Sequence, residues 1–433
     1  MKTTYWALVL IAATLLFSSS NINWGGEHYR TVLQSDSWAY HAYLPSLLLQ
    51  HDPNFEAADS IEPKLYFDAA RFQDYRVLID DTAHINKYYI GTALMQLPLF
   101  LIAHSYALAT GSEANGWSKP YVVAVNLSAI AFLLTGLWCL ARLLAMYEIS
   151  DGVRGFTLAV FVFGTNLFYY SVAAPGMSHA YSFGLCSALL FLVRRMALSP
   201  EPSRAIGLGA LLGAMILIRP VNALIVLALP ILFDDMAQFR RCINALARAP
   251  WALLKTVMAL GAVVTIQLLY YRTATGHWFV YSYGTEAFHW TQPHMLDMLF
   301  SYRKGLFVYT PITALSCVGL YFLWRRSPYA AVAWVFFTLL LTYVLSCWWS
   351  WWYGGSFGSR VYIEYLPLFA LPFALAVQQA SRRWRHGIIG AALVLVALCQ
   401  IQTYQARYNR IHWADMDRTR YWDEFLRIDR IPR

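Results

Sequence analysis

One acid and three cations attract attention because each occupies an unusual place for a charge in so apolar a chain. Asp36 follows a membrane-length apolar segment, and Arg219 lies inside an apolar run. Lys87 precedes another apolar stretch, and Arg360 follows a glycine-rich loop. An aspartate at a helix start can cap the helix or accept a proton from a hydroxyl group, and arginine can hold a phosphate with two hydrogen bonds. These residue types suit proton transfer and phosphate binding, and helix capping and lipid-headgroup contact are the structural alternatives.

The elements that must position these residues are membrane helices. The 433 residues are 58% hydrophobic and only 13% charged, whereas about 25% of a soluble domain is charged. The apolar residues form long runs, each near the roughly 20 residues that cross a bilayer. The sequence therefore predicts an all-α polytopic membrane protein with a single domain, 1–433. After a first span at the N-terminus, the predicted runs are Tyr121–Leu140, Phe156–Val172, Tyr181–Val193, Ala205–Phe233, Val257–Tyr271, Leu306–Trp324, Ala331–Cys347, Val361–Ala376 and Ile388–Ile401.

The basic residues indicate which loops lie in the cytoplasm. They cluster in the short loops between runs, at Arg142 and Arg154, at Arg194, Arg195 and Arg204, at Arg240, Arg241, Arg248 and Lys255, at Arg325 and Arg326, and at Arg382, Arg383 and Arg385. Loops rich in Lys and Arg stay on the cytoplasmic side of a membrane. This rule also accounts for the net charge of +9 without a nucleic-acid partner.

This sidedness has two consequences. Ala205–Phe233 has basic loops on both sides, so we expect two half-helices that meet at Arg219–Pro220, because proline breaks a helix interior. Residues 20–119 must form a first outer loop, in which 89–109 is a helix on the membrane surface, broken near Pro98, and not a span. The tail 406–433 also lies outside. The expected architecture has about eleven membrane helices, including the broken pair, and juxtamembrane helices on the outer face.

Several kinds of chemistry lack their sequence signals. The six cysteines show no CxxC or CxxH spacing, which argues against a metal site or a disulfide framework. No GxxxxGK[ST] motif occurs, and no GxGxxG follows a strand, which argues against a nucleotide-driven enzyme. The unusual polar residues fall on the predicted outer face, so a donor held in the membrane suits this layout.

Five stretches carry a resemblance to a known superfamily. "SDSWAYHAYLPSLL" (35–48) places an acid early in the first outer loop, and "INKYYIGTALMQLPLF" (85–100) places a lysine before a surface helix. "LLGAMILIRPVN" (211–222) ends a glycine-containing half-helix in Arg-Pro, and "YRKGLFVYTP" with "WWYGGSFGSRVYIEYLPLF" follows late in the chain. In order and sidedness these stretches resemble the GT-C glycosyltransferases, in particular the lipid A aminoarabinose transferase and protein O-mannosyltransferase group.

The resemblance implies a function and a set of roles. Such enzymes move a sugar from a polyprenyl-phosphate donor to an acceptor hydroxyl, here by an inverting single displacement. Asp36 would be the catalytic base, and Lys87, Arg219 and Arg360 would bind the donor phosphate. The acceptor would be a glycan, a lipid or a protein hydroxyl. No metal and no cofactor would be required, and membrane lipids would be the surrounding partner.

A second group of residues could contact substrate. These are Tyr40, Tyr43, His179, Tyr283, Glu286, Arg303 and Trp352. Structural roles compete with each assignment, because tyrosine and tryptophan also form interfacial belts and a loop histidine is often only hydrogen-bonded. In the same way, Glu364 lies one turn from Arg360 and could simply pair with it.

Two other functions stay open at this point. One is a transporter or flippase for a lipid-linked glycan, for which we find no internal repeat. The other is an O-antigen ligase or polymerase that uses a diphosphate-linked donor. We expect a multi-pass bacterial plasma (inner) membrane protein with its site on the periplasmic or extracellular face, since the sole N-x-S/T sequence, at Asn126, lies inside a predicted span.

Overall fold

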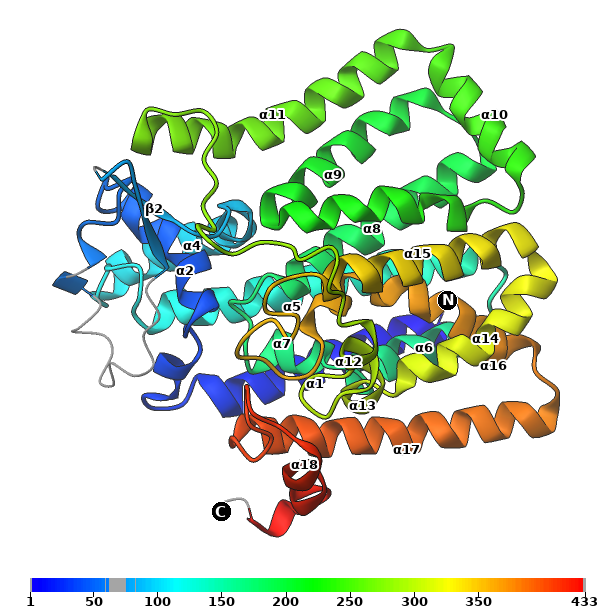
Figure 1. The fold of residues 1–433 in the computed structure, drawn as a ribbon. Helices are drawn as coiled ribbons and strands as arrows, with labels where there is room; N and C mark the ends of the chain where they lie inside the picture. The colour runs from blue at the N-terminus through cyan, green and yellow to red at the C-terminus, as the bar shows by residue number, and fades with distance from the viewer. Residues whose placement is uncertain (1, 59, 62–74, 82, 431–433) are drawn as a thin grey trace.

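The computed structural model describes residues 2–58, 60–61, 75–81 and 83–430, which form one helical bundle with a small hairpin at one end (Figure 1). Six predicted runs are continuous helices: α1 (Lys2–Asn23), α5 (Lys119–Ala145), α8 (His179–Leu198), α11 (Pro250–Thr275), α15 (Pro328–Ser346) and α17 (Arg382–Arg407). The polytopic helical fold expected from the apolar runs is therefore confirmed.

Other predicted runs are interrupted by short breaks. The run 156–172 divides into α6 (Asp151–Phe163) and α7 (Leu167–Val172), and 306–324 divides into α13 (Leu306–Tyr309) and α14 (Ile312–Arg326). The run 361–376 begins as the 3₁₀ segment η5 (Arg360–Tyr365) and continues as α16 (Leu366–Gln379). Among the described residues eight helices are long and apolar enough to cross a membrane, or nine if one bent pair counts as a span. About eleven were expected.

The predicted break at Arg219–Pro220 is present. Helix α9 (Ala205–Ile218) ends at Arg219, whose backbone is extended, and the 3₁₀ segment η4 (Pro220–Leu232) follows. A residue before proline is pushed out of the α region, and proline has no N–H to continue the helix. The second half is thus a 3₁₀ and not an α-helix. It turns by 119° into α10 (Met236–Ala247), which Asp235 caps through the amide of Gln238.

The first outer loop builds the opposite end of the bundle from several short elements. They are η1 (His28–Thr31), α2 (Asp36–Leu48), the antiparallel strands β1 (Arg76–Ile79) and β2 (Ala83–Asn86), and α4 (Gly91–Thr110). Figure 1 shows α2, α4 and β2 together at this end. We call it the site end.

The remaining short elements belong to other segments of the chain. They are η3 (Pro202–Arg204), α12 (Met295–Phe300), α18 (Arg418–Glu424) and η6 (Ile428–Arg430).

Helix α4 differs in one respect from the expectation for 89–109. It is one continuous helix with Pro98 inside it, so the predicted break is wrong. Gly91, at its start, packs against the backbone of Leu217 at the end of α9. His104, in its second half, bonds Tyr121 at the start of α5 at 2.7 Å. These contacts hold α4 at the site end along its length. Its length and composition also suit a span, and its position on the membrane surface stays a prediction.

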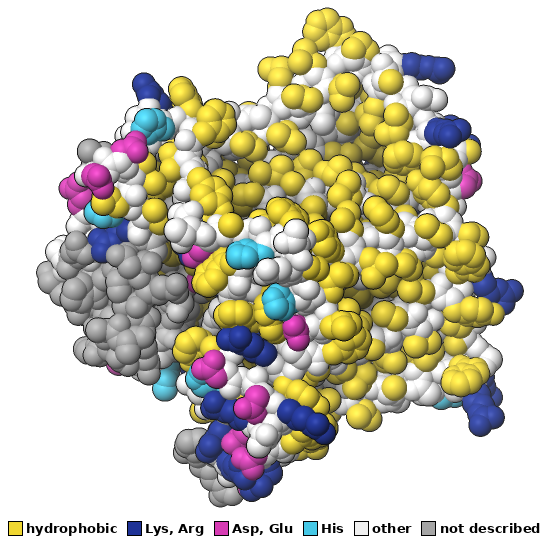
Figure 2. All heavy atoms as spheres, viewed as in Figure 1, with side chains coloured by type: hydrophobic (Ala, Val, Ile, Leu, Met, Phe, Trp, Pro, Cys, Tyr) yellow, Lys and Arg dark blue, Asp and Glu magenta, His cyan; other side chains and the backbone are white. Residues whose placement is uncertain are grey.

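The far end of the bundle carries the basic loops. Arg194 is buried there; it donates to the carbonyl of Leu232 at 2.7 Å and pairs with Asp234. Arg326 donates to the carbonyl of Tyr147, and its guanidinium lies 5.3 Å from the centre of that ring. Figure 2 shows Lys and Arg side chains along this edge and hydrophobic side chains across the middle of the visible face. The acid and cations of interest therefore lie at the opposite end from the basic loops.

The core between α14 and α16 requires a glycine at one close approach. A Cβ at Gly319 would overlap the carbonyl of Pro372. We expect Gly319→Ala to destabilise the protein by about 1–3 kcal/mol, because added volume in a packed core forces the backbone apart. Gly390→Ala in α17 is the matched control: no atom outside the adjacent backbone of α17 lies within 4 Å of the added Cβ, and alanine favours a helix by up to about 1 kcal/mol. The apparent Tm in detergent measures both, and an unchanged Tm for Gly319→Ala would contradict the packing.

Candidate functional site

Asp36 is the first residue of α2 and does not cap it. The N-cap position belongs to Ser35, which has a left-handed φ of 50° and no side-chain capping bond. One carboxylate oxygen of Asp36 accepts a hydrogen bond from the hydroxyl of Tyr88 at 2.8 Å, and the other pairs with Arg360 at 2.8 Å. The carboxylate therefore faces other segments of the chain, and the capping alternative is excluded.

The surroundings of Asp36 favour its ionised form. Its side chain is 14% exposed, and that of Arg360 is 11% exposed. Burial by itself would raise the pKa of Asp36, but the Arg360 charge, the hydrogen bonds from Tyr88 and Arg360, and the Lys87 charge together lower that pKa below its usual value. Burial and the charge of Asp36 raise the pKa of Tyr88 well above 10. The pair is thus a carboxylate with a protonated tyrosine donor.

Arg360 reaches Asp36 from the end of the glycine-rich loop. Gly354 and Gly358 both have positive φ, and a Cβ at Gly358 would crowd Tyr309. The amide of Phe357 donates to the hydroxyl of Tyr170 at 3.0 Å, which fixes the loop just before Arg360. The loop conformation thus depends on residues that permit left-handed backbone and close approach.

Arg219, at the break between α9 and η4, lies in a second charged group. Its guanidinium donates to Glu364 at 2.9 Å, and Glu364 also faces Nδ1 of His179 at 3.2 Å. Glu364 is 1% exposed. The suggestion that Glu364 pairs with Arg360 is therefore wrong: both residues belong to η5, but Arg360 turns to α2 and Glu364 turns to the α9–η4 break.

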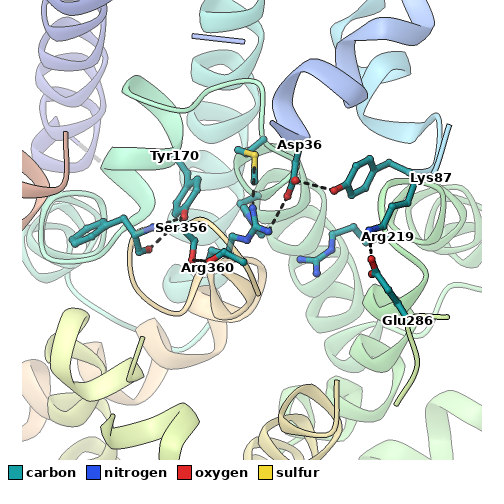
Figure 3. Close-up of polar contacts among 12 residues, drawn as sticks. Asp36, Lys87, Tyr170, Arg219, Glu286, Ser356 and Arg360 are labelled. Carbon is teal, nitrogen blue, oxygen red and sulfur yellow. Dashed lines mark hydrogen bonds and ion pairs between the residues drawn. The ribbon is translucent and has the colours of Figure 1, made fainter. Parts of the chain in front are cut away.

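Lys87 forms the third pair, with Glu286 of the loop 276–294. Its ammonium group also lies 5.7 Å from the centre of the Tyr283 ring and 5.9 Å from that of Tyr88. The hydroxyl of Ser282 donates to the carbonyl of Lys87 at 2.7 Å, which holds this loop against the start of α4. In Figure 3 Arg219 points toward the region between Arg360 and the Lys87–Glu286 pair.

The three cations of the site share one feature, which is an ion pair with a carboxylate. Each of the three cations predicted to bind phosphate already has a carboxylate partner: Asp36 for Arg360, Glu364 for Arg219 and Glu286 for Lys87. The three pairs come from segments far apart in the sequence. Figure 3 shows Asp36 with Arg360, Arg219, and Lys87 with Glu286 close to one another. An arriving phosphate would have to compete with these carboxylates for the cations.

The remaining predicted contact residues divide into two groups. The Tyr40 ring packs 4.8 Å from Tyr88 beside Asp36, whereas Tyr43 is fully buried and donates to the carbonyl of Tyr88 at 2.6 Å. Tyr43 thus holds the backbone of Tyr88, whose hydroxyl donates to Asp36. Arg303 lies 3.6 Å from the centre of the Trp352 ring and donates to the carbonyl of Ala414. That pair ties the aromatic loop to the C-terminal tail.

Sequence reasoning missed three residues that hold the charged groups. Tyr88 follows Lys87 in the stretch "INKYYIGTALMQLPLF". Its place beside a predicted site residue was the one local indication of its role. Tyr170 lies within a predicted span, and Lys304 follows Arg303 in the quoted stretch "YRKGLFVYTP" without a role assigned to it. Their partners are remote in sequence, so no local pattern could have assigned them. Within the described part of the chain, no group of three or more His, Cys, Asp or Glu residues is placed to hold a metal ion.

The fold and this charged cluster define a polytopic helical membrane protein with a largely buried, charged site. Solved structures with a similar fold include ArnT from Cupriavidus metallidurans in the apo state, with a TM-score of 0.55, 12% sequence identity and 94% of this chain covered. ArnT bound to undecaprenyl phosphate gives a TM-score of 0.50, 14% identity and 93% coverage. AglB from Archaeoglobus fulgidus, in complex with an inhibitory peptide and a dolichol-phosphate, gives 0.50, 10% and 97%.

These matches confirm the resemblance at the level of the fold. No protein-family model and no curated protein sequence matches the chain. The chain spans 65% of each ArnT chain and 57% of the AglB chain. It therefore shares the helical architecture of these longer proteins, and the roles of its residues are argued from its own site.

The Arg219–Glu364 pair gives a prediction about stability. Glu364→Gln leaves the largely buried guanidinium of Arg219 without its carboxylate, and we expect a loss of about 2–4 kcal/mol. The double variant Arg219→Met/Glu364→Gln removes the unpaired charge and should recover part of this loss. Apparent Tm values of the two single variants and the double variant in detergent measure the coupling. Losses that simply add would show that the two side chains do not interact.

Proposed function

We propose that this protein is a membrane glycosyltransferase that moves a sugar from a polyprenyl-phosphate donor to an acceptor hydroxyl, on the periplasmic or outer face of a bacterial plasma membrane. The observation that carries the proposal is the convergence of Asp36, Lys87, Arg219 and Arg360 at the site end, each with the partners described above. A carboxylate base beside several cations suits the attack of a hydroxyl on a carbon that bears a phosphate leaving group.

The proposed reaction is a single displacement. Asp36 takes the proton of the acceptor hydroxyl while the acceptor oxygen forms a bond to the anomeric carbon. The bond between that carbon and the phosphate oxygen breaks, and polyprenyl phosphate leaves with the electron pair. The sugar inverts its configuration. Negative charge grows on the leaving phosphate, so cations directed at it lower the barrier, by about 3–4 kcal/mol for each well-placed donor in a dry site.

The Asp36–Arg360 pair links donor binding to base strength. While Arg360 contacts Asp36, the pKa of the carboxyl group stays low and the carboxylate is a weak base. A donor phosphate that draws Arg360 toward itself would remove this stabilisation and make Asp36 a stronger base. The carboxylate would thus gain proton affinity only when a leaving group is present.

Lys87 and Arg219 are the other proposed phosphate ligands. Their side chains are each 16% exposed, which leaves them within reach of a ligand while limiting screening by water. ArnT has been solved with undecaprenyl phosphate and AglB with dolichol-phosphate and a peptide. By analogy of fold, a lipid phosphate would approach this end of the bundle.

Mass spectrometry of the lipid that copurifies with the protein tests the donor. A polyprenyl-phosphate hexose or pentose would support the proposal. A polyprenyl diphosphate carrying a glycan would favour a ligase or polymerase. Transport of a lipid-linked sugar across proteoliposomes without a new glycosidic bond would favour a flippase.

The proposed base gives a kinetic prediction. With the copurified donor, Asp36→Asn should lower the transfer rate at least about 100-fold, because the amide cannot accept the proton. The Asp36→Asn protein should still copurify with the lipid, because Asp36 is not a proposed phosphate ligand. Asp297→Asn, the same change at an exposed residue of α12, is the control and should leave the rate unchanged. Normal turnover by Asp36→Asn would remove Asp36 from the mechanism.

The ion pair gives a pH prediction. The acid limb of kcat/KM reports the base in the free enzyme, and the lowered pKa of Asp36 places that limb below the usual range of an aspartate. Activity is therefore retained as pH falls until Asp36 is protonated. Arg360→Gln removes the main charge that lowers this pKa, so the limb should move to higher pH. A limb at the same pH in both proteins would show that Arg360 does not control the base.

A further inference from the structure

Lys304 is a buried cation that the proposed reaction does not use. It follows Arg303 at the site end and is 2% exposed. Its ammonium group donates to two main-chain carbonyls, those of Ser356 in the glycine-rich loop and Trp413 in the C-terminal tail, the latter at 2.5 Å. Two segments that are far apart in sequence therefore share one lysine.

No carboxylate in the described ranges forms an ion pair with Lys304. Burial lowers the pKa of Lys304 well below its usual value, and the charges of Arg360 and Arg303 lower it further, while Asp415 acts in the opposite sense. Burying an ammonium group is costly unless hydrogen bonds compensate it. The ammonium group of Lys304 has main-chain carbonyls as its hydrogen-bond acceptors. Burial of this lysine is therefore compensated only if those carbonyls keep their positions.

The two carbonyls belong to segments that are also joined directly. The amide of Ser356 donates to the same Trp413 carbonyl at 3.1 Å. Around this point the side chains of Tyr309, Phe357, Ile411, Met416 and Tyr421 form a small buried cluster. Ser356 lies four residues before Arg360, with Gly358 between them. The position of the Ser356 carbonyl thus limits where the loop can deliver Arg360.

We propose that Lys304 is a positioning residue that holds the loop 353–359, and through it Arg360, in register with Asp36. The segment 411–416 supplies the second half of this clamp, so the C-terminal tail belongs to the framework of the site. The role of Arg360 toward a lipid phosphate rests on the proposed function. The clamp itself is a property of the fold and is tested separately.

Hydrogen–deuterium exchange of the full-length protein in detergent tests the clamp. Lys304→Met keeps the length of the side chain and removes its donors, so amide exchange should rise about tenfold or more in both 353–359 and 411–416. Lys255→Met, the same change at an exposed residue of α11 at the far end, should leave both segments unchanged. Unaltered exchange at either segment in Lys304→Met would overturn the proposal.

Lys304→Gln is the second variant and carries the test if the methionine protein does not fold. Its amide keeps N–H donors but no charge, so exchange in the two segments should rise less than in Lys304→Met. An equal rise in both variants would show that the hydrogen bonds to the carbonyls are not what holds the loop, and would overturn the proposal.

A double-mutant cycle separates positioning from general stability. Binding of undecaprenyl phosphate is measured for the wild type, Lys304→Met, Arg360→Met and the double variant. If Lys304 acts through Arg360, its substitution should weaken binding about 5- to 20-fold in the wild type and less than about twofold when Arg360 is already replaced. The same factor in both backgrounds would overturn the positioning role.

The two arms also separate this inference from the proposed function. Failure of the wild type to bind undecaprenyl phosphate would count against the proposed donor. The exchange experiment would then decide the clamp by itself, because it needs no ligand.

Discussion

Charges buried among apolar helices need partners, and the site end is organised by that constraint. Taking an ion out of water costs several kcal/mol even after relaxation, and the cost is recovered only with close opposite charges and hydrogen bonds. Asp36 and Arg360 satisfy it across α2 and η5, and Glu364 and Arg219 satisfy it across η5 and the α9–η4 break. Two successive turns of η5 thus connect the first outer loop with a broken helix in the middle of the chain.

Two of the backbone irregularities of the fold lie where these pairs form. Arg219 stands at the one point where the chain leaves α9 for a 3₁₀ segment, and Arg360 begins another 3₁₀ segment after a loop with two left-handed glycines. In a regular α-helix, side chains four residues apart lie on the same face, so Arg360 and Glu364 would point to the same side. The 3₁₀ geometry of η5 lets the two side chains turn to separate partners. The interruptions allow the charged groups to turn toward one another inside an otherwise regular bundle.

Pairing each cation with a carboxylate also has a chemical meaning. The three pairs together carry no net charge. Under the proposed function, the cations would turn toward the phosphate of the arriving donor, a phosphodiester with one negative charge. The resting protein would then hold its base in a weak form and its phosphate ligands in reserve. The similarity in fold to ArnT and AglB extends over most of this chain at 10–14% identity, so the shared property is the helical scaffold, and the chemistry belongs to the side chains placed on it.

The sequence by itself determined the class of fold, because apolar length and the low share of charge report directly on the solvent around each segment. It also located the break at Arg219–Pro220, since the effect of proline on the preceding residue is local. It did not determine the interruption of 156–172, the continuity of α4 through Pro98, or the partner of Glu364. Those depend on which segments pack together, and packing can override a proline or redirect a charge. Tyr88, Tyr170 and Lys304 became recognisable only in the tertiary structure, because hydrogen bonds between residues tens to hundreds of positions apart leave no periodic trace in the chain.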